Sequence, residues 1–255
     1  MTLPKLEPLE LSTSNPGFVS KYKFDIRLAQ LTGTNGPRDL YSAYNADFFD
    51  KYATAFAKAI ESDILIGYDG SRVHKSISVS SKEYMRRSGI NIIELDGPVT
   101  VPEFMFSCYK HGLPGCFFGR SHSPQQYVGL KLVINIGNAI DLLRKNGAEI
   151  NFPKSIKRNS IFGFLPRTLA PVIEELIGEN QLVHPKDIGS VEMLDTVDMR
   201  EEFFKSLKKV TPIDKIEGEF IVDCRHSMAG EIWEIINRES NANITLDNNI
   251  LSLFV

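Results

Sequence analysis

The sequence predicts an α/β fold in which a sheet is layered with helices, followed by the first elements of an incomplete second α/β unit. Helical patterns alternate with short apolar runs between residues 45 and 146, and a new strand-like run begins at residue 219. Turn-forming residues bound these runs, which is typical of buried strands rather than buried helices. Alternation of this kind indicates layered α/β domains.

The overall composition is that of an ordinary globular protein. Of the 255 residues, 42% are hydrophobic and 24% charged, so a sizeable core is expected. The net charge of −3 gives no general affinity for nucleic acids. The three cysteines have no CxxC spacing, which disfavours a disulfide framework or a zinc site. Neither a signal peptide nor a run of roughly 20 apolar residues is present, so we expect a cytoplasmic protein without a membrane partner.

The first elements combine an irregular start with a clear helix. Residues 1–20 contain three prolines and predict an irregular arm, and residues 21–27 are expected to be extended. The run TGTNGPR at residues 32–38 consists of turn-forming residues. A helix is expected from Asn45 as the N-cap to Ile60, because large apolar side chains recur every four residues.

Strands and helices then alternate up to residue 146. Four apolar runs predict strands, at residues 63–69 (DILIGYD), 91–95 (NIIEL), 116–118 (CFF) and 129–136 (GLKLVINI). Helices are expected between and after them, at residues 79–88, 102–111 and 138–146. Proline at the first position of the second helix and Gly112 after its last residue are typical helix boundaries.

The second half predicts a linker and a new unit. We expect an irregular stretch at residues 151–165, and then helices and strands at residues 168–177 (helix), 195–209 (helix), 219–224 (strand), 228–238 (helix) and 242–246 (strand). The predicted organisation is therefore an arm at residues 1–20, a main domain at 21–190, and a linker helix with the start of a second domain at 191–255.

The loop after the strand at residues 116–118 carries the chemistry that the sequence offers. It reads GRSHSPQQYVGLK from residue 119 to residue 131, with a serine hydroxyl followed by an imidazole. Ligands in open α/β sheets bind where strands end, so a transferable group at Ser121 is well placed. Pro124 stiffens the loop, Gly129 permits a tight return, and Lys131 is expected at the start of the next strand, facing the serine.

This loop resembles the phosphoserine loop of the α-D-phosphohexomutases, the phosphomannomutase and phosphoglucomutase superfamily. That loop reads T-A/G-S-H-N-P and then P-x-Y-N-G-x-K. The residues in register are Ser121, His122, Pro124, Tyr127, Gly129 and Lys131. The resemblance implies that Ser121 is phosphorylated, that Lys131 acts as general acid and base, and that His122 steadies the phosphoryl site.

Three further segments resemble the same family, in the same order. Residues 23–27 (KFDIR) resemble A-Y-D-I-R-G, whose arginine contacts the active-site phosphate, which implies this role for Arg27. Residues 66–69 (IGYD) resemble a G-x-D strand end, and residues 219–230 resemble the opening of the family's second domain. The resemblance implies a mixed sheet in the main domain, and Arg120 in the loop is expected to help bind phosphate.

The resemblance implies intramolecular phosphoryl transfer on a hexose phosphate, with Mg²⁺ as cofactor. The family's D-G-D-x-D-R metal loop is absent from the sequence, so Mg²⁺ would be held only through a phosphate oxygen on Ser121. Serine replaces the family asparagine at Ser123. Because phosphoryl transfer depends on stabilising negative charge, we expect little activity from this chain alone, and a separate chain could supply the missing domains.

Two other functions stay open on the sequence alone. The chain could be a non-catalytic, truncated or degenerate mutase that binds a sugar phosphate or a partner. It could also be a serine hydrolase, since residues 119–123 (GRSHS) resemble a G-x-S-x-G nucleophile elbow without its second glycine. Individual residues also have structural interpretations: Arg27 as an ion-pair partner of Asp25, Lys131 as a solvated edge residue, and Asp69 as a helix cap.

Overall fold

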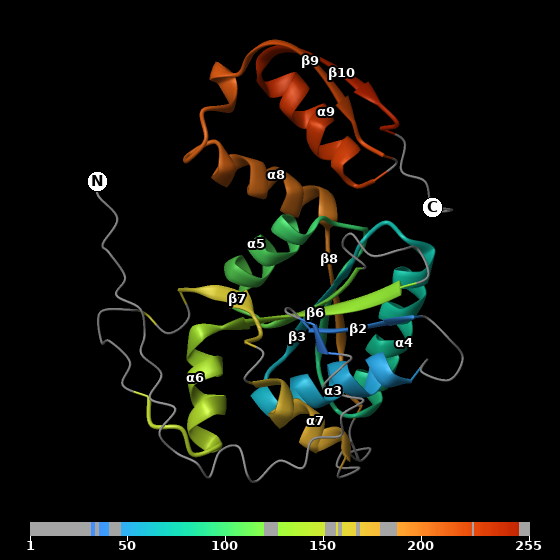
Figure 1. Ribbon diagram of the computed structural model, residues 1–255, viewed down its shortest axis with the longest axis vertical. Helices are drawn as coiled ribbons and strands as arrows, with labels where there is room; N and C mark the ends of the chain where they lie inside the picture. The colour runs from blue at the N-terminus through green and yellow to red at the C-terminus, as the bar shows by residue number, and fades with distance from the viewer. Residues whose placement is uncertain are drawn as a thin grey trace.

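The computed structural model describes residues 32–33, 36–40, 47–119, 127–150, 157, 160–166, 169–178, 188–225 and 227–249. In these residues the chain forms one large sheet with helices on both faces and a smaller unit with a two-stranded sheet (Figure 1). The large sheet contains strands β1 (Thr32–Gly33), β2 (Gly36–Leu40), β3 (Ile64–Tyr68), β4 (Ile92–Leu95), β5 (Gly115–Phe118), β6 (Tyr127–Asn135), β7 (Phe162–Phe164) and β8 (Val191–Leu194).

The large sheet is mixed, as the resemblance implied. Its strand order is β1-β2-β6-β5-β3-β4-β8, with β7 also paired to β6. Strands β5, β3, β4 and β8 run parallel to one another. Strand β6 is antiparallel to β5, β2 and β7. The predicted α/β fold with a mixed sheet and covering helices is therefore confirmed.

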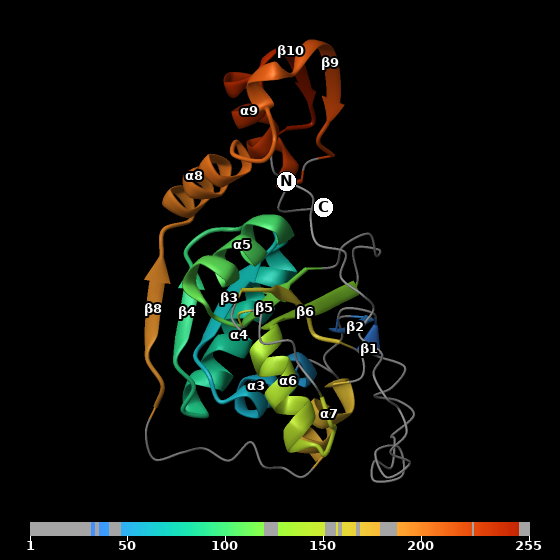
Figure 2. The ribbon, with the colours of Figure 1, turned by 90° about the vertical axis from the view of Figure 1, so that its left-hand side faces the viewer.

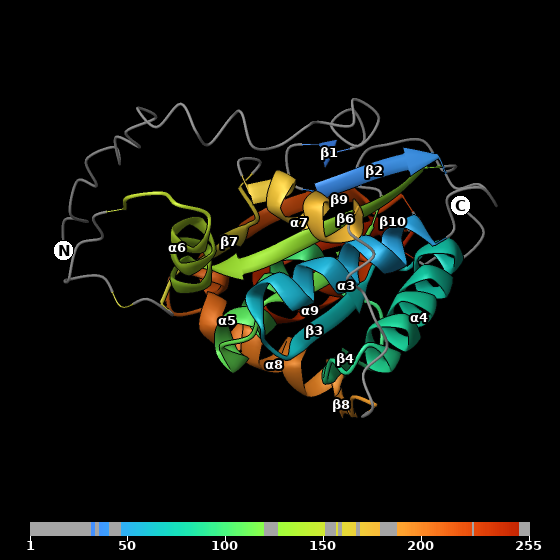
Figure 3. The same ribbon diagram turned by 90° about the horizontal axis from the view of Figure 1, so that it is seen from below.

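Helices cover both faces of this sheet, and each face has its own apolar cluster. Helices α3 (Phe48–Ile60), α4 (Arg72–Arg87), α6 (Ile136–Lys145) and α7 (Ala170–Gly178) pack on the face that includes Ile66 and Phe118. Helices α5 (Val101–His111) and α8 (Thr196–Leu207) pack on the face that includes Leu65 and Phe117. Figure 3 shows α3 and α4 next to each other. Alternation of side chains along each strand divides the core in this way.

Most predicted elements are present, and the differences have local causes. The helix expected from Asn45 begins at Phe48, and its N-cap is Asp47, which forms an ion pair with Lys51 (2.5 Å). The helix expected at residues 79–88 begins seven residues earlier, at Arg72. Its buried face includes His74, Ser78 and Ser81, and these polar side chains hide the apolar period that sequence analysis relies on.

Helix α5 follows the prediction closely. Thr100 and Glu103 form a capping box at its N-terminus, and Gly112 ends it with a φ of 69°. Pro102 occupies the second rather than the first helical position. These boundary residues act locally, so the sequence alone reveals them.

Four strands were not predicted. Strands β1 and β2 form from residues expected to be a turn, β7 forms within a stretch expected to be irregular, and β8 forms where no element was expected. Strands β2 and β7 pair with β6, β1 pairs with β2, and β8 pairs with β4, so tertiary pairing rather than local propensity makes them strands. The expected arm at residues 1–20 and extended segment at 21–27 lie outside the described residues.

The smaller unit contains β9 (Glu217–Asp223), α9 (Ala229–Glu239) and β10 (Asn241–Asp247), with the strands paired in parallel. It lies beyond α8, away from the large sheet (Figure 2). The domain division expected at residue 190 remains a prediction, and β8 on its far side belongs to the large sheet. Within the described ranges, every helix is too short or too polar to cross a membrane.

Candidate active site at the carboxyl edge of the sheet

The carboxyl ends of the parallel strands form one edge of the large sheet. Asp69 follows β3, Asp96 follows β4, and Gly119 follows β5. In open α/β sheets this edge is where ligands bind. The loop that contains Ser121 begins here, immediately after Gly119.

Of the site residues predicted from the sequence, the structure describes Lys131. Arg27, Arg120, Ser121 and His122 lie outside the described residues, so their roles remain predictions. The base of the loop is described. The Gly119 N–H donates to the carbonyl oxygen of Gly129 (2.8 Å), which holds the end of β5 against β6.

Lys131 lies within β6, opposite Phe117 of β5, rather than at the start of the strand. It is only 8% exposed, so the interpretation as a solvated edge residue is wrong. Its Nζ lies 5.5 Å from the centroid of the Phe117 ring. Burial, and next the nearby charge of Arg38, lower the pKa of the Lys131 amine, whereas Asp69 acts in the opposite direction. An amine shifted in this direction gives up its proton more readily, which suits general acid–base chemistry.

Arg38 is a charged residue near Lys131 that sequence analysis did not single out. Strand β2 pairs with β6 so that Arg38 stands opposite Gly129. A Cβ built on Gly129 would lie 3.5 Å from Arg38 Nε and 2.7 Å from the carbonyl oxygen of Gly119. Any side chain at position 129 would therefore collide with the base of the loop. The available signal was an arginine closing the glycine-rich run TGTNGPR, but only the pairing of β2 with β6 brings it to Lys131.

Asp69 and His74 form a hydrogen-bonded pair at the same edge of the sheet. Asp69 Oδ1 accepts hydrogen bonds from the Ser71 N–H (3.0 Å) and from His74 Nδ1 (2.7 Å). The N-cap of α4 is Ser71, so the expectation that Asp69 itself caps this helix is wrong. His74 is buried at 1% exposure. A histidine five residues after a strand-ending aspartate is too weak a sequence pattern to have indicated this pair.

The described residues provide no donor set for the expected Mg²⁺. In the part of the chain that the structure describes, no three His, Cys, Asp or Glu side chains gather closely enough to hold a metal ion. Asp96 is engaged with Thr196, whose N–H and Oγ1 both donate to its Oδ1 (2.9 and 2.6 Å). The predicted donor, a phosphate oxygen on Ser121, lies outside these residues.

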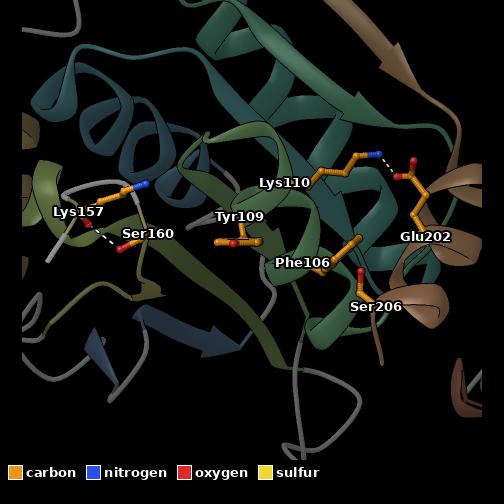
Figure 4. Close-up of a pocket in the computed structure, with 7 residues that line it drawn as sticks. All are labelled: Phe106, Tyr109, Lys110, Lys157, Ser160, Glu202 and Ser206. Carbon is orange, nitrogen blue, oxygen red and sulfur yellow. Dashed lines mark hydrogen bonds and ion pairs between the residues drawn. The ribbon is translucent and has the colours of Figure 1, made fainter. Parts of the chain in front are cut away.

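An open groove of about 600 Å³ lies elsewhere on the molecule (Figure 4). Its lining residues are Phe106, Tyr109, Lys110, Lys157, Ser160, Glu202 and Ser206. Helix α5 runs from the carboxyl end of β4 to the amino end of β5, so the α5 residues in this groove lie toward the opposite edge of the sheet. The groove is separate from the carboxyl-edge site.

The chain order around Ser121 argues against the serine hydrolase alternative. A nucleophile elbow joins a strand to a helix. Here β5 leads through the loop to β6, an antiparallel strand. The described strands on either side of the loop are thus a paired antiparallel set rather than a strand followed by a helix.

Comparison with known proteins supports the resemblance. Residues 29–152 match the family model described as phosphoglucomutase/phosphomannomutase, alpha/beta/alpha domain I. No curated protein sequence matches the chain. The matched span includes Arg38, Ser121 and Lys131 and leaves Arg27 outside.

Among the solved structures with a similar fold are three phosphomannomutase or phosphoglucomutase proteins. A putative phosphomannomutase from Thermus thermophilus is 17% identical with a TM-score of 0.64, over 87% of this chain and 46% of that one. A phosphoglucomutase/phosphomannomutase family protein from Burkholderia thailandensis is 15% identical with a TM-score of 0.61, over 88% and 45%. Parafusin, a phosphoglucomutase from Paramecium, is 13% identical with a TM-score of 0.56, over 88% and 44%. The chain therefore spans less than half the length of these proteins, and at such identities the likeness shows the fold. The resemblance to this superfamily is confirmed.

Proposed function

We propose that this chain, whose residues 29–152 match domain I of the phosphohexomutases, takes part in intramolecular phosphoryl transfer on hexose phosphates through Ser121. The observation that carries the proposal is the position of two cationic side chains, Arg38 and Lys131, at the base of the Ser121 loop. Phosphoryl transfer is mainly positioning and stabilisation of spread negative charge. Arg38 supplies that stabilisation throughout the reaction, and Lys131 supplies it when it is protonated.

The described residues suggest a division of roles. We assign to Arg38 the phosphate contact that the sequence resemblance gave to Arg27, because β2 brings Arg38 beside Gly129. Arginine presents a fixed fork of donors that matches a phosphoryl group. Arg120 and His122 remain proposed contacts of the same group.

Lys131 is proposed as the acid and base. In the forward step the bond between Ser121 Oγ and phosphorus breaks, and a bond forms between phosphorus and a sugar hydroxyl oxygen. The neutral Lys131 amine takes the proton of that hydroxyl, and the resulting ammonium returns a proton to Ser121 Oγ. The lowered pKa of Lys131 favours the neutral amine that the first half of this step requires.

We propose that turnover needs further parts of an active site besides the residues at this edge of the sheet. A mutase must keep its sugar bound while the phosphoryl group moves from one position of the sugar to another. This chain spans less than half the length of each similar structure. We propose that a separate chain, or a further segment, completes the cleft and provides the ligands of Mg²⁺. On its own the chain should accept a phosphoryl group but turn over hexose phosphates weakly.

The test is transfer of a phosphoryl group to the pure chain from a hexose 1,6-bisphosphate, followed by intact-mass measurement and peptide mapping. We expect one phosphoryl adduct, located on Ser121, that disappears in Ser121→Ala and decreases in Arg38→Gln. Ser123→Ala is the matched control and should keep the adduct. An adduct that survives in Ser121→Ala would contradict the proposal. Hexose phosphate binding without any adduct would favour the non-catalytic alternative.

A further inference from the structure

The pair formed by Asp69 and His74 is unused in the steps above, although it lies at the same edge. A carboxylate only accepts hydrogen bonds, so the proton of the 2.7 Å contact is on His74 Nδ1. The same Oδ1 also accepts the Ser71 N–H at 3.0 Å. One oxygen of Asp69 is therefore fixed by two donors from the start of α4.

The other oxygen of Asp69 faces the start of the Ser121 loop. A Cβ built on Gly119 would lie 3.0 Å from Asp69 Oδ2. The backbone of Asp69 is held at the same place, because its N–H donates to the carbonyl oxygen of Phe118 (3.0 Å). The carboxylate is thus clamped between α4 and the end of β5.

The environment of His74 argues that this clamp is more than packing. The ring is 1% exposed, and within the described part of the chain its Nε2 is buried without a hydrogen-bond partner. An unsatisfied buried polar atom costs about 1–3 kcal/mol. An apolar side chain would fill the same space without that cost, so the benefit of histidine lies in the bond from Nδ1 to Asp69.

We propose that His74 is a positioning residue that holds the Asp69 carboxylate against Gly119, so that its negative charge faces Lys131 and Arg38 at the base of the Ser121 loop. The inference deepens the proposed function, since it assigns the charge balance of the same site. It does not depend on phosphoryl transfer being observed.

The positioning role of His74 should have a measurable effect on the pKa of Lys131. Burial and Arg38 lower the pKa of Lys131, and Asp69 is the group that opposes them. The facing groups come from three elements: Arg38 from β2, Asp69 from the end of β3, and Phe117 from β5. If His74 no longer holds Asp69 in place, the opposing charge moves away and the pKa of Lys131 falls further.

The experiment is NMR titration of the whole chain with labelled lysine side chains, with the Lys131 signal assigned by its loss in Lys131→Met. In His74→Leu the Lys131 midpoint should move down, and Asp69→Asn should move it at least as far. His74→Asn keeps a side-chain N–H donor and should retain the wild-type midpoint. His111→Leu, at the far end of α5, is the matched control and should leave the midpoint unchanged.

Three outcomes would overturn the inference: a wild-type midpoint in His74→Leu, a midpoint in His74→Asn as low as in Asp69→Asn, or an equal change in His111→Leu. If His74→Leu does not fold, the contrast between His74→Asn and Asp69→Asn decides the question. A Lys131 shift as expected, together with no adduct on Ser121, would uphold the positioning role and refute the phosphoryl transfer.

Discussion

Arg200 of α8 donates from Nε to Oε1 of Glu103, a fully buried carboxylate in the first turn of α5 (2.6 Å). The other oxygen of Glu103 accepts the Thr100 N–H and hydroxyl (2.7 and 2.8 Å). Arg200 Nη2 also donates to the carbonyl oxygen of Pro98 (3.3 Å). The segment that follows β4 is thereby tied to α8.

Removing this arginine should be costly. Arg200→Met leaves the buried Glu103 carboxylate without its cation, and breaking a buried pair in this way costs about 3–5 kcal/mol. Urea unfolding monitored by circular dichroism measures the change in the free energy of unfolding. Glu231→Gln removes only the more exposed ion pair of Arg200 and should cost about 0–1 kcal/mol. Equal losses in the two variants would refute the special position of Glu103.

Two ion pairs link α8 to α9, and the link should be sensitive to salt. Arg200 of α8 pairs with Glu231 in the first turn of α9. Lys208, the C-cap of α8, pairs with Glu239, the last residue of α9. At about 1 M salt the Debye length is about 3 Å, and such partly exposed pairs weaken. Nitrogen relaxation of the amides should then show faster tumbling of the unit formed by β9, α9 and β10. Lys208→Gln at low salt should act in the same direction, and an unchanged unit in both conditions would argue against the link.

Asp96 should contribute stability that depends on pH. Hydrogen bonds from the Thr196 side chain and backbone lower the pKa of Asp96 below its ordinary value. A carboxylate with a lowered folded-state pKa stabilises the fold above its unfolded pKa of about 3.9, and this stability is lost as the pH falls through the folded value. Asp96→Asn should therefore lower stability at neutral pH and flatten its decline in acid. Unfolding measured from pH 7 to pH 2 tests this, and parallel curves for the two proteins would contradict it.

Gly129 should be intolerant of any side chain. In Gly129→Ala the new Cβ would lie 2.7 Å from the carbonyl oxygen of Gly119, so β5 and β6 must separate at the base of the loop. We expect a loss of about 1–3 kcal/mol in thermal unfolding and a weaker adduct on Ser121. Gly163→Ala in β7 is the control, because nothing lies within 4 Å of a Cβ at that position. Equal stabilities would show that the loop base can shift.

The charge of Arg38 should lower the pKa of Lys131. In Arg38→Met the cation that lowers the pKa of Lys131 is gone, so this pKa should rise toward its ordinary value, in the direction opposite to that expected for Asp69→Asn. The lysine NMR titration described above measures both changes. An unchanged pKa in both variants would mean that burial alone controls Lys131, and movement in the same direction would contradict the opposite effects of the two charges.

The sequence by itself determined the α/β alternation, strands β3 to β6 to within two residues at either end, and the boundaries of α5. It also identified the phosphohexomutase resemblance, since the Ser121 loop is one continuous segment. These features depend on neighbours along the chain, where side-chain period, capping residues and turn residues act.

Only the tertiary structure decided which charged groups meet at the carboxyl edge. The pairing of β2 with β6 brings Arg38 to Gly129, and burial between strands gives Lys131 its lowered pKa. The contact of Asp69 with His74 depends on how α4 leaves the sheet. Strand order and burial follow from packing of the whole chain, because no local pattern states which distant strand becomes a neighbour.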